Sequence, residues 1–538
     1  MILLKIRTVG IVVSKKPVMG EDMHQKGHFS GELTAFLALF LDNIGVFVFF
    51  SGILVFTFNY PLEIILKHMV PGTALAVLFG DLVYTWMAYR LGKSTKRKDV
   101  TAMPLGLDTP SSIGLAFAVI GPAYVATKDP ILTWQIGMST LFLIGVVKVI
   151  TAFFGSRVQR IIPRAGLLGS IAGIGLVLLG FLPLLEIFNE IVVGMLALGL
   201  IFAALLGRMT LPGRMSGVLA AVILGAILHL ILGYAGLLPE FQEPTWTFAL
   251  CLPSFSYEFL ETLPKCVKYL PIAIPFGLMT IIGGINNTES ARLAGDNYKT
   301  RDILLTEALT SLIAAFFGGV IQTTPYIGHP AYKKMGATYW YTLATGLLIG
   351  LGALVGLLSV FLALIPRAVL APIFLFIGFE IVHQAYRESP ESHSPAVSFS
   401  FLPVIANLVM IILTQFLAFS AVTFDAFPLR LRILHQSLTV LSNGFVLTAM
   451  LWGSIVALII DRKAHAAAAY SLCCGVLTIF GLMHSVIPSG EIYFPWSAPN
   501  HTNLWMAGSY GLLACVFFIQ RGELDPLPSQ ARVRLCWN

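Results

Sequence analysis

The chain has 538 residues, of which 57% are apolar and only 11% are charged, and its mean hydropathy is +0.84. Soluble globular proteins carry about 25% charged residues, so this composition excludes a soluble chain and predicts a polytopic, all-α membrane protein. The net charge of +7 fits basic cytoplasmic loops better than nucleic-acid binding. Six scattered cysteines and the lack of a metal-ligand spacing predict no disulfide framework, no metal site and no cofactor.

Apolar segments recur along the whole chain at the length that a bilayer requires, about 20 residues for a helix. Residues 1–30 form a basic N-terminal segment, and basic residues then concentrate in alternate loops. This alternation predicts cytoplasmic termini and a multi-pass protein of the plasma membrane, or of the inner membrane in a bacterium. Sixteen spans are predicted, at 32–56, 62–89, 103–124, 131–154, 163–185, 188–206, 214–237, 264–287, 303–320, 322–335, 338–364, 367–385, 398–420, 438–460, 467–487 and 503–520.

A long connection at residues 239–263, rich in proline, aromatic residues and glutamate, separates two sets of seven predicted spans. Because seven is odd, the second set must be inverted relative to the first, which is an arrangement common in transporters. We therefore predict one repeat at 31–238, an extracytoplasmic linker at 239–263 and an inverted repeat at 264–462. Residues 463–538 would add two extra transmembrane helices and a short cytoplasmic tail.

The third segment of each predicted repeat is interrupted by proline, in MPLGLDTPSSIG in the first repeat and in QTTPYIGHP in the second. Proline removes a backbone donor, and unpaired backbone groups are too costly to face lipid. Matched interruptions point to a binding site at the bilayer midplane, although simple kinks are the alternative. The short match of Thr109 and Pro110 with Thr324 and Pro325 supports the pairing. The predicted substrate contacts are Thr109, Ser111, Thr324, Tyr326, Gly328 and His329.

Two acidic residues within predicted spans are candidates for proton coupling, because a carboxyl group in an apolar cavity can hold a proton near neutral pH. Glu289 follows Asn286 and Asn287 near the end of the eighth span, and we expect it to bind substrate and carry the proton. The alternative places Glu289 at the cytoplasmic rim, paired with Arg292. Asp42, in the middle of the first span, is the second carrier or a buried structural residue. Structural roles are expected for Asp81, Lys148, Glu307 and Glu380.

Three stretches resemble signature segments of the nucleobase–ascorbate permeases, also called xanthine/uracil permeases, nearest their adenine/guanine/hypoxanthine branch. They are INNTESARLAGDN, TTPYIGHPAYKKMGA and IPRAGLLGSIAGIGLVLLG, and the resemblance extends over about residues 31–462. It implies a 7+7 inverted-repeat transporter, with spans one to four and eight to eleven in a core domain and the others in a gate domain. It also implies broken third and tenth segments, a homodimer and Glu289 as the substrate-binding acid. This chain departs from the family at Gly328, where a second acid is expected, and in its two extra helices.

The resulting hypothesis is a secondary active transporter that takes up a purine-type nucleobase, or a similar small planar solute, with H⁺ or Na⁺. One alternative is an anion transporter of the same fold, such as the sulfate type. An anion site would favour a buried positive charge over Glu289, and the sulfate group usually carries a soluble C-terminal domain, for which residues 521–538 are too short. A second alternative is a non-transporting scaffold. An enzyme is not expected, because the sequence offers no evident nucleophile–base pair or metal cluster.

Overall fold

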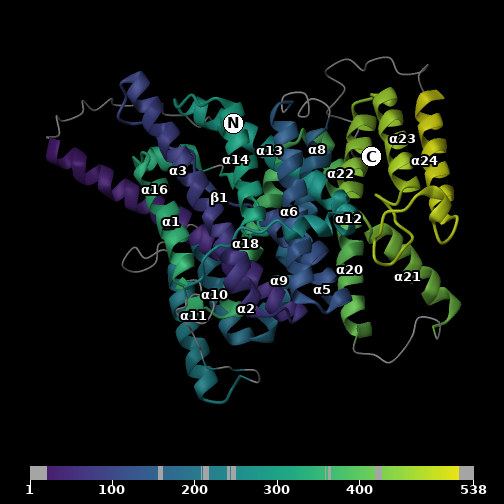
Figure 1. Cartoon of the computed structure of the whole chain (residues 1–538), viewed down its shortest axis with the longest axis horizontal. Helices are drawn as coiled ribbons and strands as arrows, with labels where there is room; N and C mark the ends of the chain where they lie inside the picture. Colours follow the sequence, from purple (N-terminus) through teal and green to yellow (C-terminus); the bar gives the residue numbers. More distant parts are fainter. Residues whose placement is uncertain are drawn as a thin grey trace, which may run out of the picture.

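The computed structural model describes residues 21–154, 162–207, 209, 217–238, 241, 243, 250–326, 328–357, 359–360, 365–418 and 427–519. The described chain is almost entirely helical, with one two-stranded sheet (Figure 1). Nine of the described helices are long and apolar enough to cross a membrane, or up to eleven if each of two bent pairs forms one span. The predicted class, an all-α polytopic membrane protein, is confirmed.

Described helices coincide with each of the first seven predicted spans, and several spans consist of consecutive helical pieces. The pieces of one span are joined by a wider, π-helical turn, such as η3 (Ala116–Ile120) between α4 and α5. Such turns are rare and often mark functional sites. The helices are α1 (Glu21–Gly52), α2 (Leu62–Ile64) with α3 (Val70–Thr95), α4 (Thr109–Leu115) with α5 (Gly121–Thr127), α6 (Pro130–Ala152), α8 (Arg164–Ile174) with α9 (Leu182–Asn189), α10 (Ile191–Leu205) and α11 (Gly217–Tyr234).

Helices of the second set follow in the same way, and two further described helices come after them. The extra pair, α23 (Ala464–Ile479) and α24 (Thr502–Ile519), packs beside α22 at the edge of the molecule (Figure 1). The residue boundaries of the repeats and the linker remain predictions. The second set is α12 (Leu263–Cys266) with α13 (Leu270–Leu293), α14 (Thr300–Phe316), α15 (His329–Met335), α16 (Trp340–Leu354), α18 (Arg367–Glu388), α19 (Ser394–Phe399) with α20 (Phe401–Ala418), and α21 (Leu429–Ser442) with α22 (Phe445–Ile460).

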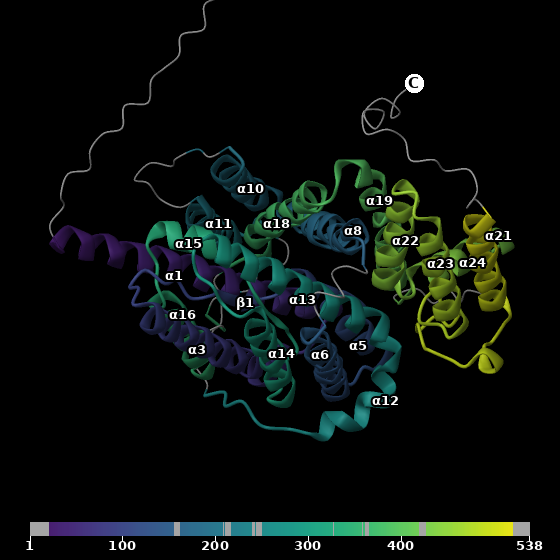
Figure 2. The ribbon, with the colours of Figure 1, turned by 90° about the horizontal axis from the view of Figure 1, so that it is seen from above.

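The helices form two packed groups, as a core and a gate domain would. In the first group α3 packs against α14 and α16, and α6 packs against α13 and α14. In the second group α18 packs against α8, α9 and α10, while α22 packs against α8 and α20. Figure 2 shows the two groups on opposite sides of the molecule, and α13 of the first group also contacts α22 of the second. The division follows the predicted grouping of spans one to four with eight to eleven.

The two interrupted segments meet as a short antiparallel ribbon in the interior. Strand β1 (Leu105–Leu107) pairs with strand β2 (Thr323–Pro325), and Gly106 lies opposite Thr324. The ribbon thus joins the third segment of one predicted repeat to the third segment of the other. Antiparallel pairing of equivalent segments is what a two-fold axis between inverted repeats produces, so the ribbon supports the predicted inversion.

The detailed match between the segments differs from the predicted one. The prediction aligned the Thr-Pro pair at 109–110 with the Thr-Pro pair at 324–325, but the first pair opens helix α4 whereas the second lies in strand β2. The structural counterpart of residues 109–110 is 329–330, where Pro330 lies in the first turn of α15. Proline is favoured in the first turn because the amides there have no helical partner in any case.

Side chains from surrounding helices satisfy backbone groups that the ribbon leaves unpaired. The side-chain oxygen of Asn43 on α1 accepts from the Leu107 amide at 3.0 Å, and the Tyr326 hydroxyl donates to the Leu107 carbonyl at 3.1 Å. The side-chain amide of Asn287 on α13 donates to the Pro325 carbonyl at 2.6 Å. An extended segment in the interior of a membrane protein is stable only with such partners, because water is excluded there.

Gly106 is required by the close approach of the Tyr326 ring to the ribbon. A Cβ atom at position 106 would lie 1.5 Å from Cε2 of Tyr326, so the ring would have to leave its place. We expect Gly106→Ala to lower the free energy of unfolding by about 2 kcal/mol or more, the usual cost of overpacking. The melting temperature of the detergent-solubilised protein tests this expectation.

Gly45→Ala is the matched control, because a Cβ atom at position 45 of helix α1 has no neighbour within 4 Å. Alanine is favoured over glycine by about 1 kcal/mol within a helix, so this variant should keep or raise the melting temperature. Equal melting temperatures for the two variants would contradict the packing of Tyr326 on Gly106.

Candidate solute-binding site

A cavity of about 500 Å³ lies between the two helix groups and borders the ribbon. One wall is made by the β1–α4 junction, β2 and the second half of α13, and the other by α8 and α18. The lining residues of α18 extend from Phe376 to Glu388 at the end of the helix, roughly 18 Å at 1.5 Å per residue. The cavity therefore runs from the ribbon toward the face at which α13 and α18 end. That face is cytoplasmic in the predicted topology.

Asp108 lies in the cavity wall, at the start of helix α4. Its Oδ2 atom accepts from the Ser111 amide at 3.0 Å and from the Gln322 side chain at 3.3 Å. The carboxylate thus caps the helix and offsets the positive end of the helix dipole. At the same place on α15 stands Gly328, without a side-chain cap. The permease resemblance predicts an acid at position 328. The structure has an acid, Asp108, at the equivalent position of the other predicted repeat.

A fully buried ion pair lies directly behind β2. The Lys148 amine on α6 is 2.9 Å from Oε1 of Glu307 on α14, and both side chains have 0% exposure. The same amine donates to the Thr323 carbonyl at 2.9 Å and to the Ser311 hydroxyl at 3.2 Å. A charge so deeply buried is stable only with a counter-charge and good hydrogen bonds. The residue that follows Thr323 lines the cavity, so the pair is separated from the solute space by a single strand.

Three of the predicted substrate contacts line this cavity: Thr109, Thr324 and Tyr326. Ser111 does not, since it is buried in the cap of α4. Asp42, the second proposed proton carrier, lies beside the Tyr326 hydroxyl and so borders the site from behind. The structure thus assembles part of the predicted set around the ribbon.

Glu289 is not brought to the cavity. Its side chain is 51% exposed and pairs with Arg292 one turn further along α13, at 2.5 Å. The alternative prediction, which placed Glu289 at the rim and paired it with Arg292, therefore describes its position. The physical reason is the phase of the helix: Asn287 faces the ribbon, and a residue two places later points about 200° away.

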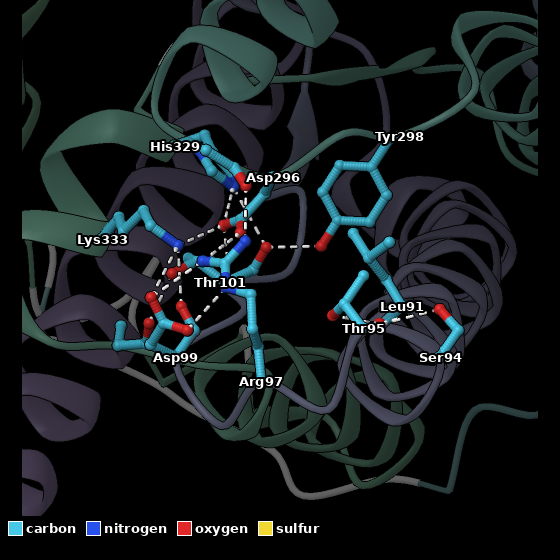
Figure 3. Close-up of polar contacts among 12 residues, drawn as sticks. Leu91, Ser94, Thr95, Arg97, Asp99, Thr101, Asp296, Tyr298, His329 and Lys333 are labelled. Atoms are coloured by element: carbon cyan, nitrogen blue, oxygen red, sulfur yellow. Dashed lines mark hydrogen bonds and ion pairs between the residues drawn. The ribbon is translucent and has the colours of Figure 1, made fainter.

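His329 and Gly328 also lie away from the cavity lining. The Nε2 atom of His329 is 3.0 Å from the Thr101 carbonyl and 3.3 Å from Oδ2 of Asp296. Asp296, in the connection after α13, also binds Lys333 at 2.7 Å and Arg97 at 3.2 Å (Figure 3). This network ties the connection after α3 and the connection after α13 to helix α15. Its members are Arg97, Asp99, Thr101, Asp296, His329 and Lys333. It gives His329 a structural setting that the sequence did not indicate.

Several polar cavity residues were not among the predicted contacts. Asp108 had a readable signal, because an aspartate before Thr-Pro is a typical helix cap. Thr280, Gly283 and Asn287 recur at helical spacing on α13, a pattern that would have favoured Asn287 over Glu289. The α18 wall, with Glu380, His383, Gln384 and Arg387, comes from a distant helix and had no local signal.

No protein-family model and no curated protein matches the sequence. Similar solved structures include the transmembrane domain of a cyanobacterium bicarbonate transporter, BicA, at 17% identity, covering 73% of this chain and 97% of that chain with a TM-score of 0.47. A structure of SLC26A9 has 12% identity, covers 77% of this chain and 72% of its own, and has a TM-score of 0.48. Murine Slc26a9, an anion transporter in the inward-facing state, has 14% identity, coverages of 75% and 69%, and a TM-score of 0.45. At these values the likeness carries no argument about the solute, and membership of the nucleobase–ascorbate permeases stays a prediction.

Asp296 should contribute strongly to stability. Burial acts to raise its pKa, but the hydrogen bonds from His329 and Lys333 outweigh burial and hold the pKa below its usual range. Asp296→Asn should lower the free energy of unfolding at pH 7 by about 3 kcal/mol, the typical effect of removing one partner of a buried ion pair. Asp99→Asn is the control, because Asp99 is 64% exposed and such pairs contribute at most about 1 kcal/mol.

The pH dependence of this effect follows from the lowered pKa. The contribution of Asp296 is present above its unfolded-state pKa, near 4, and is lost as the pH falls through the lower folded-state pKa. The difference in melting temperature between the unmodified protein and Asp296→Asn should therefore be full at pH 7 and shrink below about pH 4. A difference that is the same at both pH values would contradict the ionised state of Asp296.

Proposed function

We propose that the protein is a secondary transporter that moves a small anion across the membrane together with a proton, with the cavity at the ribbon as the solute site. The support is the position of the cavity, between two packed helix groups and beside a pair of interrupted segments. In transporters built from inverted repeats, access alternates when one group moves against the other around such a site. The cavity is large enough for a small solute and extends along α18 toward the face at which that helix ends.

The buried charge of Lys148 carries the choice of an anion. An anion site needs a positive charge in a region of low dielectric, where its field is weakly screened. Lys148 supplies that charge one strand behind the cavity wall. Glu289, the acid on which the nucleobase hypothesis depended, is exposed at the rim. The observation that separates the two hypotheses therefore favours the anion.

The acids around Lys148 provide the coupling to protons. Glu307 pairs with Lys148, and Asp108 lies close enough to interact with the same amine. With both acids ionised, the cluster of one amine and two carboxylates has a net negative charge, which repels an anion. A proton on one carboxylate removes that net negative charge and leaves the Lys148 ammonium less offset, so that proton and anion bind together. Neither binds well alone, which is the requirement for coupled transport.

A neutral planar solute such as a nucleobase is the second candidate. The cavity is lined by the polar residues Asn287, Thr324, Tyr326 and Asp108. Donors and acceptors of this kind match the edge of a heterocycle, and the Tyr326 ring offers a flat face. This candidate needs no net positive charge in the site.

Uptake into proteoliposomes that contain the purified full chain tests the proposal. Labelled chloride, bicarbonate and sulfate are compared with labelled adenine, guanine and uracil, each with and without an inward proton gradient. We expect uptake of at least one anion, faster with the gradient and abolished by a protonophore. Uptake of a nucleobase and of no anion would replace the proposal by the second candidate. Uptake of none of these solutes would overturn both.

Variants of the Lys148–Glu307 pair should separate the effect of the lysine charge on anion uptake from the dependence of uptake on protons. The double variant Lys148→Met/Glu307→Met removes both charges at similar volume and should lower anion uptake at least 100-fold. Because it also removes the donor to the Thr323 carbonyl, uptake is compared at equal amounts of folded protein. Glu307→Gln should retain anion exchange but lose the acceleration by the proton gradient. Glu289→Gln is the rim control and should transport within twofold of the unmodified protein. Loss of uptake in Glu289→Gln alone would instead support the role that the sequence predicts for Glu289, substrate binding and proton coupling.

A further inference from the structure

A groove of about 1140 Å³ lies at the face where α1 begins and α3 ends, separate from the solute cavity. Its walls are α1 near Leu33 and Phe36, the last turns of α3, the connection that follows α3, and the start of α16. The loop charges predict that this face is cytoplasmic. The groove combines an apolar floor with a rim of basic residues: Lys93, Lys96, Arg97 and Lys98.

Three of the four basic residues are available to a ligand. Arg97 is committed, because its guanidinium binds Asp99 and Asp296 (Figure 3). Within the described part of the chain, the ammonium groups of Lys93, Lys96 and Lys98 make no ion pair, and all three side chains are exposed. Lys96 holds the left-handed conformation at the end of α3, with φ of 56°, where glycine would be less strained.

The single acid among the groove-lining residues offsets only part of this charge, because four basic residues line the same groove. Glu32 on α1 accepts hydrogen bonds from the Thr338 amide and hydroxyl and from the Tyr341 amide, so both its oxygens are engaged at the start of α16. Asp99 lies beside the lysines, but Arg97 binds it through both oxygens. The groove therefore offers a net positive rim.

Exposed aromatic residues lie in the groove and on the adjacent face of α3. Tyr89 and Trp340 line the groove with 52% and 56% exposure. Trp86 lies one turn before Tyr89 on α3, also exposed, with Arg90 stacked over its ring at 5.2 Å. Residues 86, 89, 90 and 93 share one face of the helix, which thus passes from aromatic to basic toward its end. Tryptophan and tyrosine favour the headgroup region of a bilayer, and lysine beyond them reaches the lipid phosphates.

From these features we infer that the groove binds an anionic phospholipid of the adjacent leaflet. The phosphate contacts Lys93, Lys96 and Lys98, and the glycerol and upper acyl chains lie against Leu33, Phe36 and Ala344. The site is independent of the solute cavity and of the proposed transport. Arg97 connects it to Asp296 and so to the connection that precedes α14, which places the lipid next to the network in Figure 3.

Binding of a fluorescent phosphatidylglycerol to the purified full chain in a zwitterionic detergent tests the inference at low salt. We expect saturable binding, at least tenfold tighter than that of phosphatidylcholine. The variant Lys93→Gln/Lys96→Gln/Lys98→Gln should weaken phosphatidylglycerol binding at least tenfold and leave the lipid-free melting temperature unchanged, because these side chains are exposed. The control Lys265→Gln/Arg430→Gln/Arg432→Gln removes the same charge elsewhere and should bind normally.

Two further arms separate a lipid from a soluble anion. Ala344→Trp fills the apolar part of the groove, keeps every lysine and should also weaken phosphatidylglycerol binding. Glycerol 3-phosphate, which has a phosphate and a glycerol but no acyl chains, should not displace the lipid at millimolar concentration. The inference is overturned if the lysine variant binds as well as the unmodified protein, if phosphatidylcholine binds equally tightly, or if glycerol 3-phosphate displaces the lipid completely.

Discussion

The structure depends on satisfying the backbone of two interrupted segments that lie where water is excluded. Strands β1 and β2 pair with one another, but two short strands leave outward-facing amides and carbonyls on both sides. Asn43, Lys148, Asn287 and Tyr326 bind these groups from three helices and from the ribbon itself. Each unsatisfied group would cost several kcal/mol in a hydrocarbon environment. The primary role of these polar side chains is thus to pair with the backbone of the ribbon, and any contact with a solute comes in addition.

The same requirement produces the chemistry of the site. A lysine that binds a strand carbonyl in the interior needs a counter-charge, and Glu307 provides it. A helix that starts in the interior needs a cap, and Asp108 provides it. The result is a compact set of one positive and two negative groups next to the cavity between the two helix groups. A proton can change the net charge of such a set without any rearrangement of the backbone, which makes it suitable for coupling proton and anion movements.

Much of the fold could be predicted because its causes are local. Span length, the alternation of basic loops and the two proline interruptions are each visible in a short window of sequence, and together they predicted the helices and the meeting of the interrupted segments. The register between the segments was wrong because the Thr-Pro letters match at two different places, a helix start at Thr109 and a strand at Thr324. Identical letters did not have identical backbone roles.

The site was less predictable because its causes are tertiary. Thr109, Thr324 and Tyr326 lie in the interrupted segments and were found. Glu289 was favoured by the family resemblance, but helix geometry turns it away from the face that carries Asn287. The opposite wall, on α18, is brought to the ribbon only by the packing of the two helix groups. Structural roles were expected for Lys148 and Glu307, yet their pairing behind β2 could be known only from the fold.

Accessibility of Thr324 tests the central claim, that the cavity beside the ribbon is the solute site. Thr324→Cys in a cysteine-free variant would be treated with a small charged methanethiosulfonate in proteoliposomes, during uptake of the transported solute. The account predicts that modification blocks uptake and that excess solute slows the modification. Modification that leaves uptake intact, or that proceeds at the same rate with saturating solute, would contradict it.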